Sequence, residues 1–350
     1  MKAVTISEVK GIIGSRGDPA VSIYLGIDER TPGSGADRAR LRALLRRASE
    51  LLAGGHHRGE VDALLVPIAE RARGAWPSAR GLGFLRSRRV NAAFALPVEV
   101  PDLAVVAPTF HLKPLLDVLD GHKRFFVLVL GERAARLLDG SGAHDVILEG
   151  TVDAAGEEPG AAALVAIDEA VREILGDTGA PLVLAGPERL RARYRSISGY
   201  GWLLPDEIDA DVEQVQAADL RPAAQALVAA HGAAVESEAV MQLISAEATG
   251  SASDDLDRIA RAATAGKVRL LLHRAGAHVW GRLDPVTGAC FVRGEQREAG
   301  DVDVIDDLCE LTLLHGGDVV AVAEERMPSG SPVAAIITRQ PLLGRRRRSG

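Results

Sequence analysis

The stretch Arg124-Phe125-Phe126-Val127-Leu128-Val129-Leu130 decides the fold of the middle of the chain. A near-continuous apolar run of this length, rich in valine, leucine and phenylalanine, predicts a strand that is buried on both faces. Around it, further strands are predicted at residues 134–139, 145–148 and 181–185, the last of them a buried strand. Helical spacing of apolar residues predicts helices at 161–175, 187–195 and 220–248.

This order of elements, three strands followed by a helix, a strand and a helix, favours an α/β layer fold related to ribonuclease H. Upstream, the pattern predicts strands at 21–25, 81–86, 90–96 and 102–107 and helices from 37 and over 60–73. Downstream, we expect helices at 256–265 and 302–315 and strands at 268–273, 277–283, 319–323 and 333–338, with Ser253 as the N-cap of the first helix.

We therefore predict an α/β protein of three domains: an N-terminal α/β domain (1–118), a ribonuclease H-like middle domain (119–249) and a C-terminal α/β sandwich (250–340), followed by a basic tail (341–350). The length of 350 residues agrees with two or three domains.

The composition excludes several classes of protein. Hydrophobic residues make up 47% and charged residues 25%, which is typical of a globular chain and not of a collagen-like or disordered one. The net charge of −7 argues against coating nucleic acid by bulk charge, although local basic faces remain compatible with it. No apolar run is long enough for a membrane helix and no signal peptide is evident, so we expect a cytoplasmic protein without a membrane partner. Cys290 and Cys309 fit no metal or redox spacing and are expected to be buried thiols.

Motifs for catalysis and cofactor binding are missing from the sequence. There is no nucleophile elbow, no phosphate-binding loop and no dinucleotide-binding glycine pattern. The run 124–130 carries no carboxylate for metal-dependent nuclease chemistry. We therefore predict no cofactor and no metal. The acidic residues Asp301, Asp303, Asp306 and Asp307 leave two interpretations open, a divalent cation site or the acidic first turn of a helix.

Arginine is the residue type that stands out. It clusters in the predicted helix after residue 37, at the turn between residues 86 and 89, in the helix near 190, and in the tail at 345–348. Because guanidinium groups bind phosphate in bidentate fashion, such clusters are typical of RNA-binding surfaces. The alternative is a set of solvated helix faces neutralised by Glu50, Glu60 and Glu70. The candidate RNA-binding residues are Arg38, Arg42, Arg46, Arg47, Arg88, Arg89, Arg191 and Arg195.

Several stretches, read in order, resemble one family. They are the arginine-rich cadence at 38–52, His111-Leu112-Lys113-Pro114-Leu115-Leu116, the apolar run at 124–130, Ile259-Ala260-Arg261-Ala262-Ala263, Val279-Trp280-Gly281 and the segment 308–319. Together they resemble the baeRF group, bacterial relatives of the archaeo-eukaryotic class 1 peptide-release factors and of Pelota. The resemblance implies a ribonuclease H-like middle domain and a C-terminal domain similar to small RNA-binding ribosomal proteins. It also implies action in the ribosomal tRNA-binding site.

In release factors of this kind a Gly-Gly-Gln loop positions the water that attacks peptidyl-tRNA. The equivalent loop here, residues 149–160, has no glutamine and four carboxylates. We therefore assign no catalytic residue, and the family's catalytic position corresponds to Thr151, Asp153, Gly156 and Glu157.

Three functions are compatible with these features. We favour a ribosome-associated factor that occupies the tRNA-binding site without hydrolysis, in rescue, hibernation or stress, with rRNA and tRNA as partners and a translational GTPase as a further candidate. The alternatives are a peptidyl-tRNA hydrolase and a protein-interaction module that binds no RNA. No DNA partner is expected.

Overall fold

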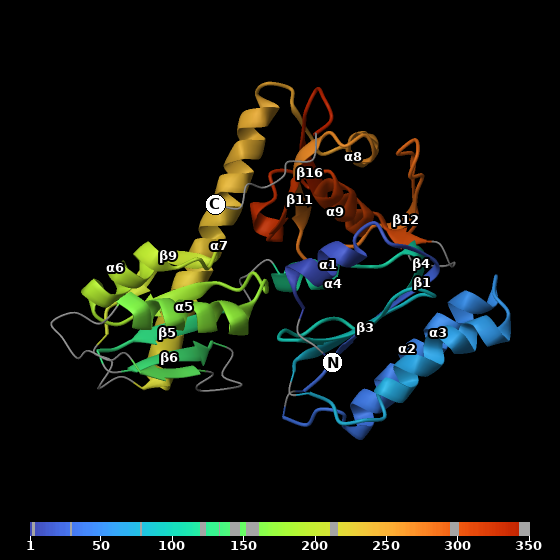
Figure 1. Ribbon diagram of the computed structural model, residues 1–350. Helices are drawn as coiled ribbons and strands as arrows, with labels where there is room; N and C mark the ends of the chain where they lie inside the picture. Colours follow the sequence, from blue (N-terminus) through green and yellow to red (C-terminus); the bar gives the residue numbers. More distant parts are fainter. Residues whose placement is uncertain are drawn as a thin grey trace. The chain divides into compact units, whose positions relative to one another are not determined.

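A computed structural model describes residues 1, 4–28, 30–77, 79–119, 124–132, 134–140, 148–151, 161–210, 216–294 and 301–342. These residues form a mixed α/β protein with several sheets, as the predicted α/β class requires (Figure 1). The chain divides into two compact units. The first comprises Met1–Ala3, Glu8–Asp117 and Val235–Gly350, and the second comprises Val4–Ser7 and Val118–Ala234.

The N-terminal part of the first unit is an antiparallel sheet covered by two helices. The sheet has the order β3-β2-β1-β4, and the two helices pack against one another. Alternate residues of β1, among them Val21, Ile23 and Leu25, share a core with Leu41 and Leu64 of the helices. The elements are β1 (Arg16–Gly26), α2 (Gly35–Ala53), α3 (Arg58–Arg71), β2 (Gly81–Arg86), β3 (Asn91–Leu96) and β4 (Leu103–Thr109).

The C-terminal part of the first unit contains two small sheets and two helices. The sheets have the orders β10-β16-β11-β15 and β13-β12-β14. Leu271 of β11 and Leu308 of α9 are fully buried in its core, which also takes in Val105 and Ala107 of β4. The elements are β10 (Ala252–Ser253), α8 (Leu256–Thr264), β11 (Val268–Arg274), β12 (Trp280–Leu283), β13 (Cys290–Val292), β14 (Val302–Asp303), α9 (Val304–Leu314), β15 (Asp318–Val322), η1 (Glu324–Arg326) and β16 (Val333–Ile337).

The predicted N-cap at Ser253 is wrong. Ser253 pairs with β16 in strand β10, and Asp255 caps α8 by accepting a hydrogen bond from the amide of Arg258 at 2.7 Å. Because residues 252 and 253 form this short strand, the helix begins only at Leu256, after Asp255. Both cysteines are free thiols; Cys309 is buried, as predicted, whereas Cys290 is only half-buried.

The second unit is built on a five-stranded sheet of order β7-β6-β5-β8-β9. β5 is antiparallel to β6 and parallel to β8, and its residues are buried along its whole length. The elements are β5 (Phe126–Leu130), β6 (Ala134–Asp139), β7 (Leu148–Thr151), α5 (Ala161–Leu175), β8 (Leu182–Ala185), α6 (Glu188–Ile197) and β9 (Leu203–Ile208). Of the strand predicted at 145–148, residues 145–147 lie outside the described residues.

Strands β9 and β13 were not predicted from the sequence, and β14 occupies the first two residues of the helix predicted at 302–315, which begins instead at Val304. β9 has the sequence Leu-Leu-Pro-Asp-Glu-Ile and occupies an edge of the sheet, where a proline and charged residues are tolerated because no ladder partner lies beyond them. Also missed were α1 (Ile6–Ile12) and η1, whereas α4 (Lys113–Leu119) follows Leu112 as the proline at 114 predicts.

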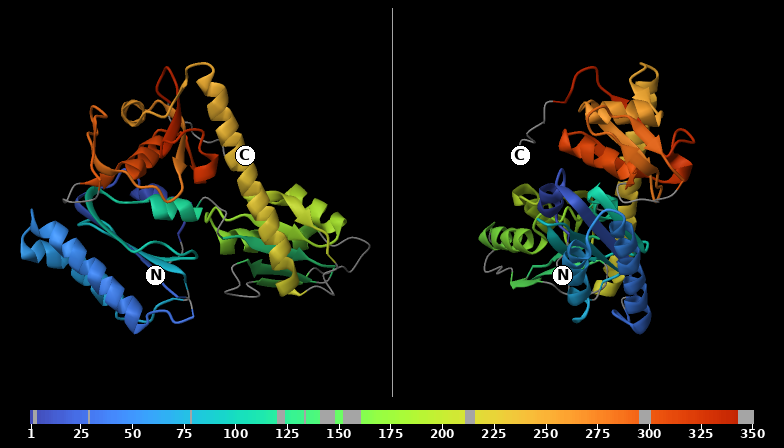
Figure 2. Two further views of the ribbon diagram at one scale, coloured as in Figure 1. Left: turned by 180° about the vertical axis from the view of Figure 1, so that it is seen from behind. Right: turned by 90° about the vertical axis from the view of Figure 1, so that its right-hand side faces the viewer.

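Helix α7 (Ala217–Glu247) is 31 residues long and contributes to both units. Figure 2 shows it as one continuous helix. Its first part buries Leu220, Ala224 and Val228 in the core of the second unit. Its last part buries Ala239 and Leu243 against the β11 and β16 strands of the first unit. Among the described helices, none combines the length and apolarity needed to cross a bilayer.

Candidate nucleic-acid interface

Helix α2 carries the largest of the predicted arginine clusters. It begins at a capping box, in which Ser34 accepts from the amide of Asp37 and the Asp37 carboxylate accepts from the amide of Ser34, both at 3.2 Å. The face that bears Leu41 and Leu52 is buried against the sheet. The capped N-terminus and the buried face fix the helix, so its arginines are held on a rigid element.

Arg42 and Arg46 lie on the solvent-exposed side of α2. They are separated by one helical turn, so their side chains are neighbours on the helix surface. In the described part of the chain neither one forms an ion pair or a side-chain hydrogen bond. Arg47 is also exposed. We call Arg42 and Arg46 the α2 ridge. Their charges are not neutralised by a neighbouring carboxylate, which is what a phosphate-binding surface requires.

Arg38, one turn before Arg42, makes its contacts within the protein. Its guanidinium group donates to the carbonyl oxygens of Gly33 at 2.9 Å and of Ala72 at 2.7 Å, and it lies 5.4 Å from the centre of the Trp76 ring. These contacts join the start of α2 to the end of α3. Arg40 is likewise engaged, by Asp37 and Asp102.

Beside α2 a hollow of about 330 Å³ is lined by three arginines, Arg30, Arg40 and Arg80, together with Asp28 and Glu99. Neither Arg30 nor Arg80 was predicted as a site residue, because both stand alone in loops and belong to no cluster in the sequence. Asp28 forms hydrogen bonds with Arg30, which lower the pKa of the Asp28 carboxyl. The hollow therefore adds one further exposed cation, Arg80, to the arginines of this layer.

The turn between β2 and β3 holds the second cluster. Ser87 shapes the turn by accepting hydrogen bonds from the amides of Arg89 and Val90. Arg88 donates to Glu60 of α3 at 2.5 Å, whereas Arg89 is exposed. One of the two predicted arginines is thus paired with a carboxylate.

The third cluster, on α6, is neutralised within the second unit. Arg191 is 8% exposed and donates to the carbonyl oxygen of Gly186 at 2.6 Å and to Glu207. Arg195 donates to the same Glu207 carboxylate at 2.9 Å and to the carbonyl oxygen of Leu204. Glu207 belongs to β9, which has no strand pattern in its sequence, so this pairing could not be predicted from the sequence. The geometry gives Arg191 and Arg195 a structural role.

The position of the family's catalytic loop is only partly described. Thr151 ends β7, and Asp153, Gly156 and Glu157 lie outside the described residues, as do the tail arginines at 345–348. Strand β5 consists of apolar residues alone, as the sequence predicted. Within the described residues, the central strand thus offers no carboxylate for a metal-dependent nuclease site.

The segment His111-Leu112-Lys113, the most specific part of the family-like pattern, is buried at a charged network of the first unit. The Lys113 ammonium group, in a side chain 2% exposed, lies 3.2 Å from the Asp303 carboxylate and 3.4 Å from Nδ1 of His278. It also donates to the carbonyl oxygen of Ala277. The amides of Leu112 and Lys113 donate to Asp306 of α9. The network therefore ties the end of β4 to the start of α9.

The same network contains the group of side chains that is best arranged to hold a cation. Among the described residues, His111, His278 and Asp303 place ligand atoms within 4.8 Å of one another. The ammonium group of Lys113 already supplies a positive charge at this point, next to Asp303 and His278. Hydrogen bonding to His278 and the charge of Lys113 lower the pKa of Asp303 in spite of its burial. Burial lowers the pKa of His111 to about 3.

The four aspartates of the acidic segment have separate partners. Asp303 caps α9, and Asp306 accepts from the backbone of residues 112 and 113. Asp301 lies 3.4 Å from Arg282, and Asp307 accepts from the Thr109 hydroxyl at 3.1 Å. Of the two interpretations, the helix N-terminus describes Asp303, Asp306 and Asp307. Burial and the neighbouring carboxylates raise the pKa of Asp306 well above its usual value.

One family model matches the chain. Residues 163–267, from α5 through α8, match the bacterial archaeo-eukaryotic release factor family 3. This part of the chain is similar to that family. The resemblance predicted from the sequence is thereby confirmed. No curated protein has a sequence that matches this chain.

Solved structures to which the chain is similar include proteins from archaea and yeast. The archaeal translation termination factor aRF1 is 15% identical, with 95% of this chain and 96% of that chain covered and a TM-score of 0.26. Dom34 of S. cerevisiae, described as a translation termination-like factor that interacts with Hbs1, is 13% identical, with 72% and 73% covered and a TM-score of 0.44. Pelota of Archaeoglobus fulgidus is 16% identical, with 75% and 85% covered and a TM-score of 0.31.

Proposed function

We propose that the protein is a release-factor-like factor that occupies the tRNA-binding site of the ribosome through RNA contacts of the α2 ridge, without hydrolysing peptidyl-tRNA. The match to a release factor family supports the translational setting. The observation that carries the RNA contact is the exposure of Arg42 and Arg46 on a capped helix, with no ion-pair partner among the described residues.

The predicted arginines differ in whether their guanidinium groups already have acceptors within the protein. Arg38, Arg191 and Arg195 already donate to carbonyl or carboxylate oxygens of the protein. Moving them onto a phosphate would leave those acceptors unpaired, at a cost of about 1–3 kcal/mol each. Arg42 and Arg46 would lose no protein partner described here. They are therefore the residues that bind phosphate most favourably.

The absence of hydrolysis is proposed from the loop sequence. A water molecule that attacks an ester needs donors that orient it and stabilise the oxyanion. The loop 149–160 contains carboxylates and no glutamine, and a carboxylate near the acceptor end repels its phosphates.

The architecture of the second unit supports the ribonuclease H-like interpretation of the middle domain. Numbered by position within this unit, the strands have the order 3-2-1-4-5, with the fourth strand parallel to the first. Three further parts of the proposal rest on the family resemblance. They are the C-terminal α/β sandwich, the cytoplasmic location and a translational GTPase partner.

Co-sedimentation with purified ribosomes tests the RNA contact. The variant Arg42→Gln/Arg46→Gln is compared with Arg258→Gln/Arg261→Gln, which removes two exposed charges from helix α8. We expect the α2 variant to bind at least fivefold more weakly and to lower the salt dependence of log K by about 1–2, because each phosphate contact contributes about 0.7–0.9. Equal effects of the two variants, or no ribosome binding by the unmodified protein, would contradict the proposal.

A second assay tests the absence of hydrolysis. The protein is incubated with ribosomes that carry peptidyl-tRNA, and released peptide is measured against a buffer control. We expect no release above the control. Release above it would favour the hydrolase alternative and reject this part of the proposal.

A further inference from the structure

Three side chains with metal-ligating atoms meet inside the first unit, after the end of β4, just before β12 and at the start of α9. Among the described residues, His111, His278 and Asp303 each place one ligand atom within 4.8 Å of the other two. Nδ1 of His278 lies 2.7 Å from Oδ2 of Asp303. Two imidazole nitrogens and one carboxylate oxygen form a donor set that is typical of zinc and other divalent transition metals.

The ring of His111 is the second observation that points to a ligand. Its side chain is 1% exposed, yet neither ring nitrogen has a hydrogen-bond partner among the described residues. The Asp306 carboxylate lies 3.6 Å from Nδ1, which is beyond hydrogen-bond distance. A buried polar atom without a partner costs about 1–3 kcal/mol and is rare in folded proteins. A metal ion would give one of these nitrogens the partner that the protein does not supply.

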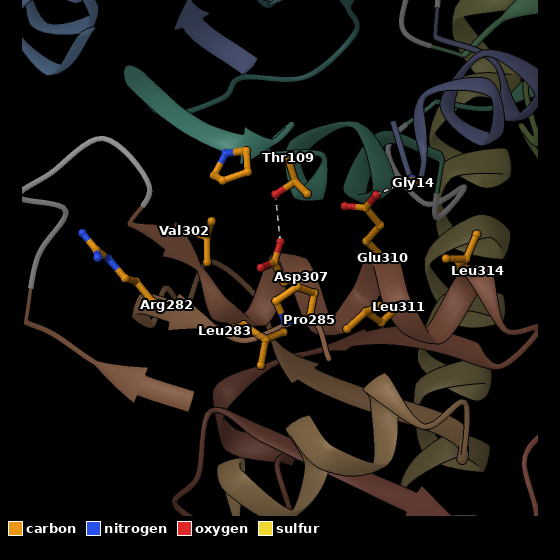
Figure 3. A pocket seen from close by; sticks show the side chains of 11 residues that line it. Gly14, Thr109, Arg282, Leu283, Pro285, Val302, Asp307, Glu310, Leu311 and Leu314 are labelled. Carbon is orange, nitrogen blue, oxygen red and sulfur yellow. Dashed lines mark hydrogen bonds between the residues drawn. The ribbon is translucent and has the colours of Figure 1, made fainter. Parts of the chain in front are cut away.

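Hydrogen bonds hold the ligands on fixed elements. Asp303 caps α9, and its Oδ1 accepts from the amides of Val279 and Ile305 at 3.0 and 3.2 Å, which leaves Oδ2 as the ligand atom. Thr109, two positions before the first histidine, donates to Asp307 of α9 at 3.1 Å (Figure 3). The segment after β4 and the start of α9 are therefore joined beside the ligands, so little reorganisation is needed to bring them together around an ion.

The Lys113 ammonium group shows that this point favours a cation. It lies 3.2 Å from the Asp303 carboxylate and 3.4 Å from Nδ1 of His278, but it leaves the nitrogens of His111 without a hydrogen bond. A divalent ion carries twice the charge and binds the lone pairs of imidazole nitrogens, which an ammonium group next to them does not satisfy here. The His278 side chain is 28% exposed, so an ion can enter from the solvent on that side.

We propose that His111, His278 and Asp303 bind a divalent transition metal ion, with zinc as the best match, and that the ion takes the place of the Lys113 ammonium group. The bound ion ties the segment after β4 to the start of α9. No metal was expected from the sequence, because the three ligands lie in distant segments and show no ligand spacing. The site is separate from the α2 ridge and does not depend on the proposed RNA contact.

Calorimetric titration of the EDTA-treated and dialysed protein with zinc chloride tests the proposal. We expect saturable binding at micromolar zinc. His278→Phe keeps a ring to stack on Trp280 and loses the ligand nitrogen, so we expect it to bind zinc at least tenfold more weakly. His57→Phe, at an exposed histidine outside the site, is the matched control and should bind zinc like the unmodified protein.

The variant Lys113→Met tests the exchange between the ammonium group and the ion. Because it removes the competing charge, we expect it to bind zinc at least tenfold more tightly than the unmodified protein does. Zinc should also raise the melting temperature of this variant, since an ion that binds only the folded chain stabilises it. Cobalt(II) in place of zinc should give visible absorption bands that are absent from His278→Phe.

Three results would each overturn the proposal. They are no saturable binding of zinc by the unmodified protein at micromolar concentrations, undiminished binding by His278→Phe, and no tightening in Lys113→Met. If His278→Phe has a lowered melting temperature, Asp303→Asn provides the same comparison, and zinc binding that this variant leaves undiminished would overturn the proposal equally.

Discussion

Replacing Lys113 by methionine removes a buried positive charge and keeps nearly the same side-chain length. The ammonium group lies 3.2 Å from the Asp303 carboxylate, and the two side chains are 2% and 0% exposed. Removing one partner of a buried ion pair leaves the other charge without compensation, which costs about 3–5 kcal/mol. Asp303 keeps hydrogen bonds from His278 and from the amide of Val279, so we expect the lower part of this range, about 3 kcal/mol.

Hydrogen exchange of the amides of helix α9 is the suitable assay, because it reports the opening of this part of the first unit by itself. We expect faster exchange in Lys113→Met that corresponds to the loss of about 3 kcal/mol. In the double variant Lys113→Met/Asp303→Asn the uncompensated charge is also gone, so its loss should be smaller than the sum of the two single losses by at least about 1 kcal/mol. Lys10→Met, at an exposed lysine of α1, is the control and should change stability by less than about 0.5 kcal/mol.

A loss below about 1 kcal/mol in Lys113→Met would refute the reasoning, since such a value is typical of an exposed pair and not of a buried one. Strict additivity in the double variant would refute it as well. In that case the network would be a set of independent contacts, and the link between β4 and α9 would rest on apolar packing.

Three further predictions concern stability. The pKa of buried His111 is lowered from 6.5 to about 3, so the unfolded chain takes up the proton first as the pH falls between these values. The free energy of unfolding should therefore decrease over this range by up to about 1.4 kcal/mol per pH unit. Urea midpoints measured at several pH values should show a shallower decrease for His111→Phe. Asp306 has the opposite effect, because its raised pKa makes stability decrease as the pH rises above the usual carboxyl pKa. Asp306 is present in both proteins, so an equally steep loss of stability at acid pH in His111→Phe would contradict the role of His111. Gly186 has a φ of +133°, and a Cβ atom there would lie 2.2 Å from the carbonyl oxygen of Leu130; Gly186→Ala should cost about 2–4 kcal/mol in thermal unfolding, whereas Gly201→Ala, which has open space around it, should be close to neutral. Glu207→Gln weakens the pairing of half-buried Arg195 and buried Arg191, so α6 should become sensitive to limited proteolysis, whereas Glu132→Gln, at an exposed pair with Arg189, should leave it resistant.

Local patterns in the sequence determined most of the helices and strands. β2, β6 and α5 have the predicted bounds, because an apolar stripe with the period of a strand or helix can be buried in only one way. The same periodicity placed Arg42 and Arg46 on the exposed face of α2. The missed strand β9 shows the limit, since a proline and two acidic residues at a sheet edge have no such period.

Only the tertiary structure decided which charges are paired. Arg191 and Arg195 resemble Arg42 and Arg46 in their spacing. Strand β9 brings Glu207 to the first pair, whereas no carboxylate among the described residues forms an ion pair with the second. Lys113 and Asp303 are 190 positions apart, and His-Leu-Lys-Pro carries no local sign that its lysine is buried. Electrostatic energy depends on distance and burial in space, and these follow from packing between distant segments and not from spacing along the chain.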